Sequence, residues 1–232
     1  PEDRVSVMGG VAFWNMGYGS DEPERARFEE TLVSFTGGVN YTHVFRNGFF
    51  AMVGLNYMQL ESRFEWSQEV GNFTVTLTDT ITQVQVNALT GEYTYVRGDV
   101  DVSVGAERSV IHYNSTRLFQ VPFAIGKSWT WNRWQTDLMV GGVLNVHTSN
   151  TGRTIYKGEL LDYNGASTDI ISNQWAIHGM GMANVTYRVT EQIGVTAGLQ
   201  FQKSISNWST EEGIEMRPYM FGGQVGLSYT FK

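Results

Sequence analysis

Hydrophobic and polar side chains alternate along much of this chain with a period of two. A β-strand sends successive side chains to opposite faces, so this period predicts strands whose two faces differ in chemistry. The closing stretch, Arg217–Lys232, shows the pattern most clearly. One of its faces carries Tyr219, Phe221, Gly223, Val225, Leu227, Tyr229 and Phe231. An apolar row with aromatic residues at both ends is typical of a strand that crosses a bilayer, where aromatic side chains line the two interfaces.

Seven further segments alternate in the same way, and together they predict an all-β transmembrane barrel of antiparallel, up-and-down strands. The eight predicted strands are Arg4–Gly17, Leu32–Phe45, Phe49–Phe64, Thr116–Trp129, Gln135–His147, Trp175–Val189, Ile193–Ile205 and Arg217–Lys232. Pro122 lies inside the fourth strand, and because proline donates no backbone hydrogen bond we expect a bulge there. We expect the last strand to pair with the first and close the barrel.

The predicted connections alternate in length. Three are short, at 46–48, 129–134 and 190–192, and four are longer and polar, at 18–30, 65–115, 148–173 and 206–216. Short periplasmic turns that alternate with long extracellular loops are typical of outer-membrane barrels. The pattern therefore predicts an outer-membrane location with both termini on the periplasmic side. Nearly all carboxylates lie in the long connections, which agrees with this topology.

The connection at 65–115 contains two alternating runs, Phe73–Val86 and Tyr93–Val104, which predict a β-hairpin. Two more wall strands, giving ten, are the alternative. We favour an extracellular hairpin extension, because its faces are rich in Thr, Gln and Asp and its apolar register slips between Ile81 and Val84. The prediction is thus one barrel domain over 1–232 that carries this extension.

The composition argues against several other classes of protein. A soluble lipocalin-like barrel or sandwich would place Lys and Glu on its polar faces, whereas here these faces hold Gly, Ser, Thr, Asn and Gln. Cysteine is absent, which excludes disulfides and thiolate metal sites. The net charge of −7 argues against nucleic acid as a partner. No apolar run approaches the length of a membrane helix, and the missing signal peptide leads us to expect a processed or truncated N-terminus.

An eight-stranded barrel has an interior just wide enough for side chains to fill it. The polar residues expected to face inward are Asn40, Asn56, Gln120, Asp137, Asn145, His178, Asn184, Arg188, Gln200 and Gln224. Buried charges need partners, and Arg188 and Asp137 could form such a pair. We interpret this set as a hydrogen-bonded core, with a water or ion pathway as the alternative. We assign no catalytic, cofactor-binding or metal-binding residues and expect no cofactor.

Two histidine patterns are candidate sites. His147 and Ser149 lie two residues apart where the fifth strand meets its loop, so they share a face, predicted to be the inner one. A histidine can activate a neighbouring serine, but no third member of a triad is identifiable. His43 and His112 have no partners at metal-ligand spacing.

Three stretches resemble a known class of membrane protein. They are Leu118–Phe123 with its internal proline, the glycine-centred Met139–Val143, and the closing Val225–Lys232. The chain resembles the small eight-stranded outer-membrane barrels, and within them the PorT-like "outer membrane β-barrel" domains of Bacteroidota. Many outer-membrane proteins end in Phe, whereas here Lys232 follows Phe231. The resemblance implies an anchoring or accessory role and identifies no site.

The expected function is that of a non-enzymatic outer-membrane protein, an anchor or accessory subunit of a secretion, transport or assembly complex. Its expected partners are outer-membrane lipid, lipopolysaccharide and other outer-membrane proteins, bound through the extracellular loops or the barrel wall. The alternatives are a narrow porin-like channel and an outer-membrane lipid A hydrolase, since small lipid A deacylase barrels use a His-x-Ser pair of the kind formed by His147 and Ser149.

Overall fold

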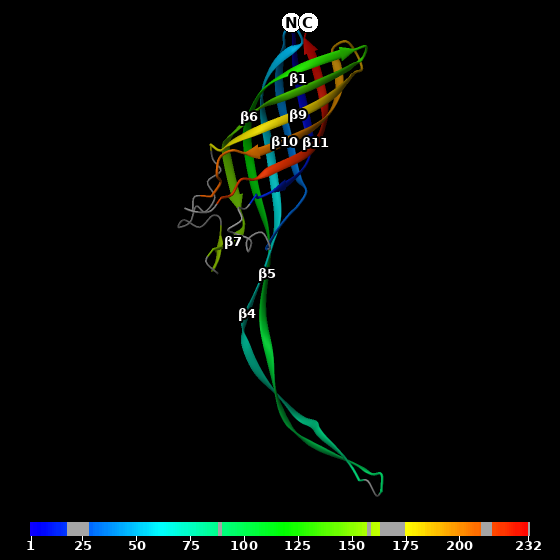
Figure 1. The fold of residues 1–232 in the computed structure, drawn as a ribbon, viewed down its shortest axis with the longest axis vertical. Coiled ribbons are helices and arrows are strands. Elements are labelled where there is room, and N and C mark those ends of the chain that lie inside the picture. Colours follow the sequence, from blue (N-terminus) through cyan, green and yellow to red (C-terminus); the bar gives the residue numbers. More distant parts are fainter. Residues whose placement is uncertain (18–27, 88–89, 157–158, 163–174, 210–214, 232) are drawn as a thin grey trace. The chain divides into compact units, whose positions relative to one another are not determined.

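A computed structural model describes residues 1–17, 28–87, 90–156, 159–162, 175–209 and 215–231. Its regular elements are β-strands (Figure 1). They are β1 (Glu2–Asn15), β2 (Glu29–Thr31), β3 (Ser34–Val44), β4 (Phe49–Val86), β5 (Tyr93–Trp131), β6 (Trp134–Thr151), β7 (Arg153–Tyr156), β8 (Glu159–Asp162), β9 (Ile177–Arg188), β10 (Ile193–Ser204) and β11 (Tyr219–Phe231). Within these ranges, no helix is long and apolar enough to cross a membrane.

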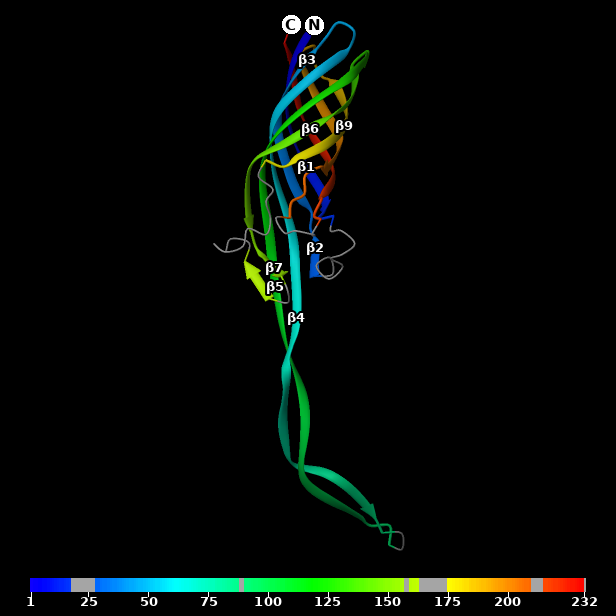
Figure 2. The same ribbon diagram turned by 60° about the vertical axis from the view of Figure 1, so that its left-hand side comes forward.

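Eight antiparallel strands form a closed ring. β1, β3, β6 and β9 are labelled in its wall in Figure 2. The main sheet contains nine strands, but the short β2 pairs only at the side of β4, beyond the end of β3. The other eight follow the order β4-β3-β1-β11-β10-β9-β6-β5, and an additional pairing between β4 and β5 closes the circle. Each strand of the ring thus has a hydrogen-bonded neighbour on both sides. The predicted eight-stranded barrel is confirmed.

The first and last strands close the ring as expected. β1 pairs with β11 from Asp3 opposite Phe231 to Asn15 opposite Tyr219. Both termini lie at the same end of the barrel (Figure 1). We call this the turn end, because the connections at 45–48, 132–133 and 189–192 also lie there, and we call the opposite end the loop end.

The short turns depend on residues that accept a left-handed backbone. Gly48 has φ 77° and Asn132 has φ 54°, a conformation that Gly and Asn adopt most readily. Because Asn132 accepts it, β5 and β6 are joined by two residues only. The predicted six-residue turn at 129–134 is therefore wrong, and Trp129, Trp131 and Trp134 belong to strands.

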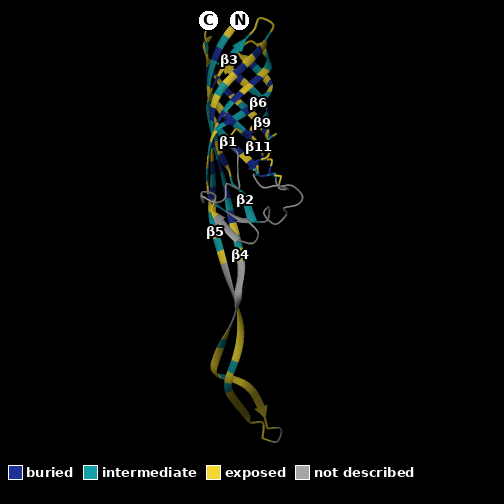
Figure 3. Ribbon diagram, turned by 90° about the vertical axis from the view of Figure 1, so that its left-hand side faces the viewer, coloured by how far each residue is buried: buried dark blue, intermediate teal, exposed yellow. Residues whose placement is uncertain are grey.

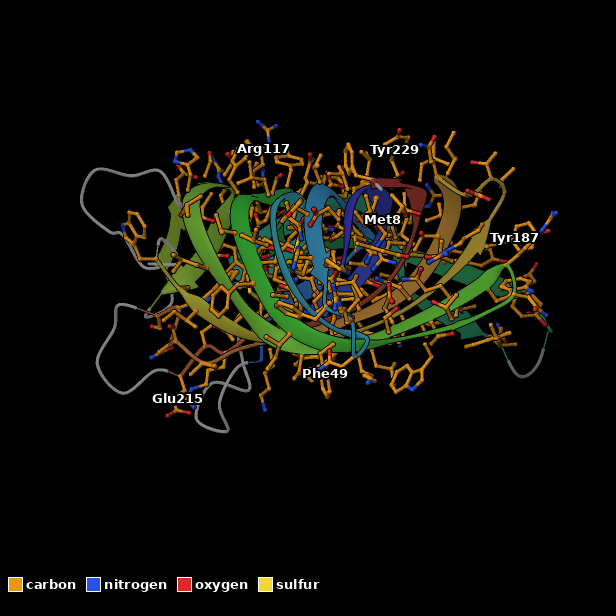
Figure 4. The ribbon with its side chains drawn as sticks, turned by 90° about the horizontal axis from the view of Figure 1, so that it is seen from above. Met8, Phe49, Arg117, Tyr187, Glu215 and Tyr229 are labelled. Carbon is orange, nitrogen blue, oxygen red and sulfur yellow. The ribbon has the colours of Figure 1, made fainter. Side chains whose placement is uncertain are left out.

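The two faces of the wall differ as the alternation predicted (Figure 3). Apolar outward side chains are exposed on every strand of the ring, with Leu55 at 68% and Val225 at 65%. Viewed from above, Met8 points into the barrel while Arg117, Tyr187 and Tyr229 point away from it (Figure 4). A soluble protein does not leave so large a continuous apolar surface in water. The wall is that of a transmembrane barrel, whose outward band contacts lipid.

A β-bulge interrupts the pairing of β5 with β6. Phe119 lies opposite His147, but the next residue, Gln120, lies opposite Asn145, so Val146 is the extra residue. The bulge predicted at Pro122 is wrong, because Pro122 keeps its pairing with Val143 and the extra residue lies on β6. An extra residue shifts the alternation by one, and every side chain after it changes face.

The long connections contain structure that the alternation did not predict. β2 pairs with β4 inside the predicted loop 18–30, most of which lies outside the described residues. β6 continues to Thr151, and β7 and β8 form a separate two-stranded sheet within 148–173.

Residues Glu65–Ile111 form a compact unit separate from the barrel. In this unit β4 and β5 carry a ladder of polar contacts, among them Arg97 to Asp79 at 2.7 Å and Thr76 to Asp101 at 2.7 Å. Asp79 has φ 55°, a left-handed conformation that Asp adopts more readily than most residues. The ring has eight strands, so the ten-strand alternative is wrong; the extracellular position of the hairpin stays a prediction.

Candidate functional site

A network of charged and amide side chains spans the interior near the turn end. Arg4 on β1 and Asp137 on β6 form a buried ion pair with 2.7 Å between Nη2 and Oδ2. Gln135 donates from Nε2 to Oδ1 of Asp137 at 2.9 Å and accepts from Arg188 at 2.8 Å. Arg188 also approaches Glu2 at 3.5 Å. Both oxygens of Asp137 are therefore engaged, and the chain of contacts links β1, β6 and β9.

The predicted pairing of Arg188 with Asp137 is wrong. Arg4 neutralises Asp137, and Arg188 reaches the network through Gln135. Arg4 and Gln135 were missed among the inward residues, although both are buried. The signal was present in the sequence, because Arg4 alternates with Val5 and Val7 and so falls on the inner face of its strand.

Two apolar clusters fill other levels of the interior. The methionine cluster consists of Phe50, Met52, Ala124, Met139, Val143, Met180 and Met182. The tryptophan cluster consists of Ala12, Trp14, Met16, Met58, Leu60, Leu118, Ala176, Trp208, Met216 and Met220. Trp208 and Met216 come from the long connection predicted at 206–216, and both are fully buried. A polar loop thus sends two large side chains into the core, which strand alternation cannot reveal.

Inward asparagines lie across glycines of the neighbouring strand. A Cβ added to Gly38, Gly54 or Gly198 would collide with the side-chain oxygen of Asn56, Asn40 or Asn184, respectively. Asn56 and Gly38 are direct cross-strand partners, as are Asn40 and Gly54, and Asn184 and Gly198. Glycine leaves the volume that an amide needs in a barrel this narrow, since the interior is only as wide as its side chains.

Several inward polar atoms have no partner within the described part of the chain. They are Asn40 Oδ1, Gln120 Oε1, His178 Nε2, Asn184 Oδ1, Gln200 Nε2, Gln202 Nε2 and Trp208 Nε1. Gln120 does donate its Nε2 to Oδ1 of Asn145 at 2.8 Å. Buried polar atoms of this kind are normally satisfied by internal water, so both donors and acceptors for water line the interior.

The ten polar residues predicted to face inward do so. Asn184 and Arg188 are half-buried and bond to the inward Met182 and Gln135, and the other eight are buried. Side-chain hydrogen bonds join several of these residues, as predicted for a hydrogen-bonded core. The remaining amides of the set have atoms without a protein partner in the described part of the chain.

His147 and Ser149 face the outside, which corrects the predicted inner position. The extra residue Val146 shifts the alternation, so both side chains are exposed. The ring of His147 lies 6.0 Å from that of Phe119, and Arg117 is the cross-strand partner of Ser149. Among the contacts that the structure describes, no carboxylate orients His147.

His43 and His178 lie in different surroundings. On the outer face at the turn end, Asp3 accepts from Tyr41 at 2.7 Å and lies 2.6 Å from Nδ1 of His43. His178 is buried beside Trp208, with ring centroids 5.7 Å apart. Across the described ranges, no group of three or more His, Asp or Glu side chains could hold a metal ion.

Comparison with known proteins gives likenesses of fold only. No family model matches this chain, and no curated protein sequence matches it either. Neisserial surface protein A is 10% identical with a TM-score of 0.49, over 99% of this chain and 97% of that one. OprG, an outer membrane protein from Pseudomonas aeruginosa, is 11% identical with a TM-score of 0.44, over 99% and 96%.

Ail, the attachment invasion locus protein of Yersinia pestis, is 8% identical with a TM-score of 0.39, over the full length of both chains. Identities this low carry no shared function, and the fold assignment rests on the ring closure itself. The likeness to the Bacteroidota family stays a prediction.

Proposed function

We propose that this protein is a non-enzymatic outer-membrane β-barrel that acts as an anchor or accessory subunit of an outer-membrane complex, with its termini in the periplasm. The apolar clusters and the Arg4–Asp137 network fill the interior at several levels, which suits an anchor better than a pore. The resemblance to the PorT-like barrels is consistent with this role.

The observation that carries the proposal is the exposed apolar surface of the hairpin unit. Many of its large hydrophobic side chains are exposed, and the ring closes with eight strands, so this surface is no part of the lipid-facing wall. These residues include Leu77, Ile81, Val84, Val86, Tyr93, Tyr95, Val96, Val102 and Val104. An isolated two-stranded ribbon is marginally stable in water, and exposed apolar surface of this extent is typical of a surface that binds another protein.

Site-specific photo-crosslinking in the producing cells tests this proposal. A benzophenone side chain at Tyr95 should give one discrete protein adduct, because Tyr95 lies on the proposed binding surface. The same group at Val225 is the matched control, since that residue faces outward from the barrel wall and should label lipid. The double variant Val84→Asp with Tyr93→Asp should abolish the adduct at Tyr95 while the barrel still migrates as a folded protein.

The proposal fails if Tyr95 gives no protein adduct, or an adduct that survives the two aspartates. An enzymatic role would appear instead as a change in lipid A mass that disappears in His147→Ala.

A narrow channel is the second candidate, because unpartnered donors and acceptors line the interior. A channel should conduct ions in planar bilayers. Its conductance should rise in Trp208→Ala, because this change removes the largest side chain of the tryptophan cluster.

A further inference from the structure

An apolar groove of about 670 Å³ lies on the outside of the barrel wall. Four adjacent strands, β1, β11, β10 and β9, each contribute one small and one larger outward residue to it, and Thr136 of β6 also lines it. This volume lies within the range of about 300–1,000 Å³ that small-molecule sites occupy. A barrel exterior is convex, so a hollow of this size needs a local cause.

The cause is a checkerboard of small and large side chains. Gly223 lies between Val11 and Leu199, while Val225 lies between Gly9 and Ala197. A Cβ on Gly223 would meet no atom within 4 Å, so the space above it is open. The larger residues form the sides of the groove and the small ones its floor.

The floor continues along β9 toward the loop end. Ala183 is followed at successive outward positions by Gly181 and Gly179, and a Cβ on Gly181 would also meet nothing within 4 Å. Phe201 on β10 and Val140 on β6 are the cross-strand partners of Gly181 and flank this track. An open track one side chain wide therefore leads out of the groove.

The track ends beside Lys203, an exposed outward residue that is the cross-strand partner of Gly179. The other outward residues of β10 are all apolar, so Lys203 is the first charge beyond the lipid-facing band. Within the described part of the chain it has no carboxylate partner, whereas nearby Arg217 contacts Glu215 at 3.4 Å. An apolar trough with an unpaired cation at its rim matches a ligand that has a hydrocarbon chain and an anionic head.

We propose that the groove holds an acyl chain of a phosphorylated glycolipid of the outer leaflet, and that Lys203 binds its phosphate. A protein segment fits less well, because the groove strands are paired on both sides and offer no free backbone groups for strand addition. The assignment to the outer leaflet rests on the proposed orientation, in which the loop end faces outward.

Native mass spectrometry of the delipidated full chain in detergent, titrated with diphosphoryl lipid A, tests the site. Ala197→Leu places a larger side chain over the floor and should weaken binding about tenfold, the effect of about 1.4 kcal/mol. Ala51→Leu is the matched control, because it makes the same change at an outward position of β4 outside the groove, and it should leave the affinity unchanged.

The charge is tested in the same way. Lys203→Gln should weaken lipid A binding about fivefold, as expected for one lysine at a membrane surface, and should leave dephosphorylated lipid A unaffected. Arg117→Gln removes an outward cation of β5 and is the control. Heat-modifiable gel migration verifies that every variant is folded.

Equal binding by Ala197→Leu and Ala51→Leu would overturn the groove assignment. Equal loss in Lys203→Gln and Arg117→Gln would overturn the phosphate contact, and phosphatidylglycerol binding as tightly as lipid A would overturn the glycolipid assignment. These titrations need neither a partner nor an oriented membrane, so they can fail while the crosslink at Tyr95 succeeds, and the reverse also holds.

Discussion

The inner and outer faces of a single strand obey opposite rules in this barrel. On β10 the inward residues are Gly194, Thr196, Gly198, Gln200, Gln202 and Ser204, whereas the outward ones are Ile193, Val195, Ala197, Leu199, Phe201 and Lys203. A soluble domain has the reverse arrangement, with apolar residues inside. The exposed apolar side chains show that the outer face of the wall contacts lipid. The inward polar side chains must instead find their hydrogen-bond partners inside the ring.

The buried ion pair should show the largest effect on the inner face. Asp137→Ala leaves Arg4 without its counter-charge and also removes the acceptor of Gln135. Breaking a buried pair from one side costs about 3–5 kcal/mol, because the remaining charge stays desolvated. We expect this loss in the urea midpoint of unfolding in lipid vesicles, followed by tryptophan fluorescence.

The double variant Arg4→Met with Asp137→Leu separates charge from packing. Replacing both members by apolar residues of similar volume removes the unpaired charge, so most of the lost stability should return. A double variant as unstable as Asp137→Ala would show that the network acts through its shape and not through its charges.

A charged side chain on the outer face should also lower the stability of the barrel, because it would contact lipid. Val225→Arg places a cation on the lipid-facing side of β11, near mid-height, which costs about 2–4 kcal/mol in a transmembrane barrel. Val86→Arg makes the same change at an exposed position of the hairpin unit and should stay within about 0.5 kcal/mol, the usual range for a surface residue in water. Identical unfolding midpoints for the two variants would contradict the lipid-facing wall.

Alternation along the sequence was sufficient to predict the ring, because each strand of a membrane barrel must keep one face apolar over its whole length. It predicted the pairing of β1 with β11 and the inward position of all ten polar residues, from Asn40 to Gln224. It failed at His147, because a bulge at Val146 has no sequence signal of its own. It also missed Trp208, since no periodicity describes a loop that folds into the interior.

Inner and outer glycines differ in the space around them. A Cβ on the inner Gly141 would collide with the backbone oxygen of Phe123, whereas one on the outer Gly181 meets nothing within 4 Å. Overpacking of this kind typically costs about 1–3 kcal/mol, so Gly141→Ala should lower the urea midpoint clearly. Gly181→Ala should leave it within about 0.5 kcal/mol of the parent. A larger loss in Gly181→Ala than in Gly141→Ala would contradict the assignment of faces.

Removal of the hairpin should have the smallest effect on the barrel. Residues Glu65–Ile111 form their own compact unit, and β4 and β5 are hydrogen-bonded neighbours, so a short Asn-Gly turn can join them. The eight strands of the ring and both apolar clusters remain after the deletion of 68–108, since no member of either cluster lies between 61 and 117. The shortened chain should therefore show an unchanged midpoint and an unchanged gel shift. If the shortened chain no longer folds, the hairpin is required for the stability of the barrel. The exposure of its tyrosines would then not be explained by binding to a partner.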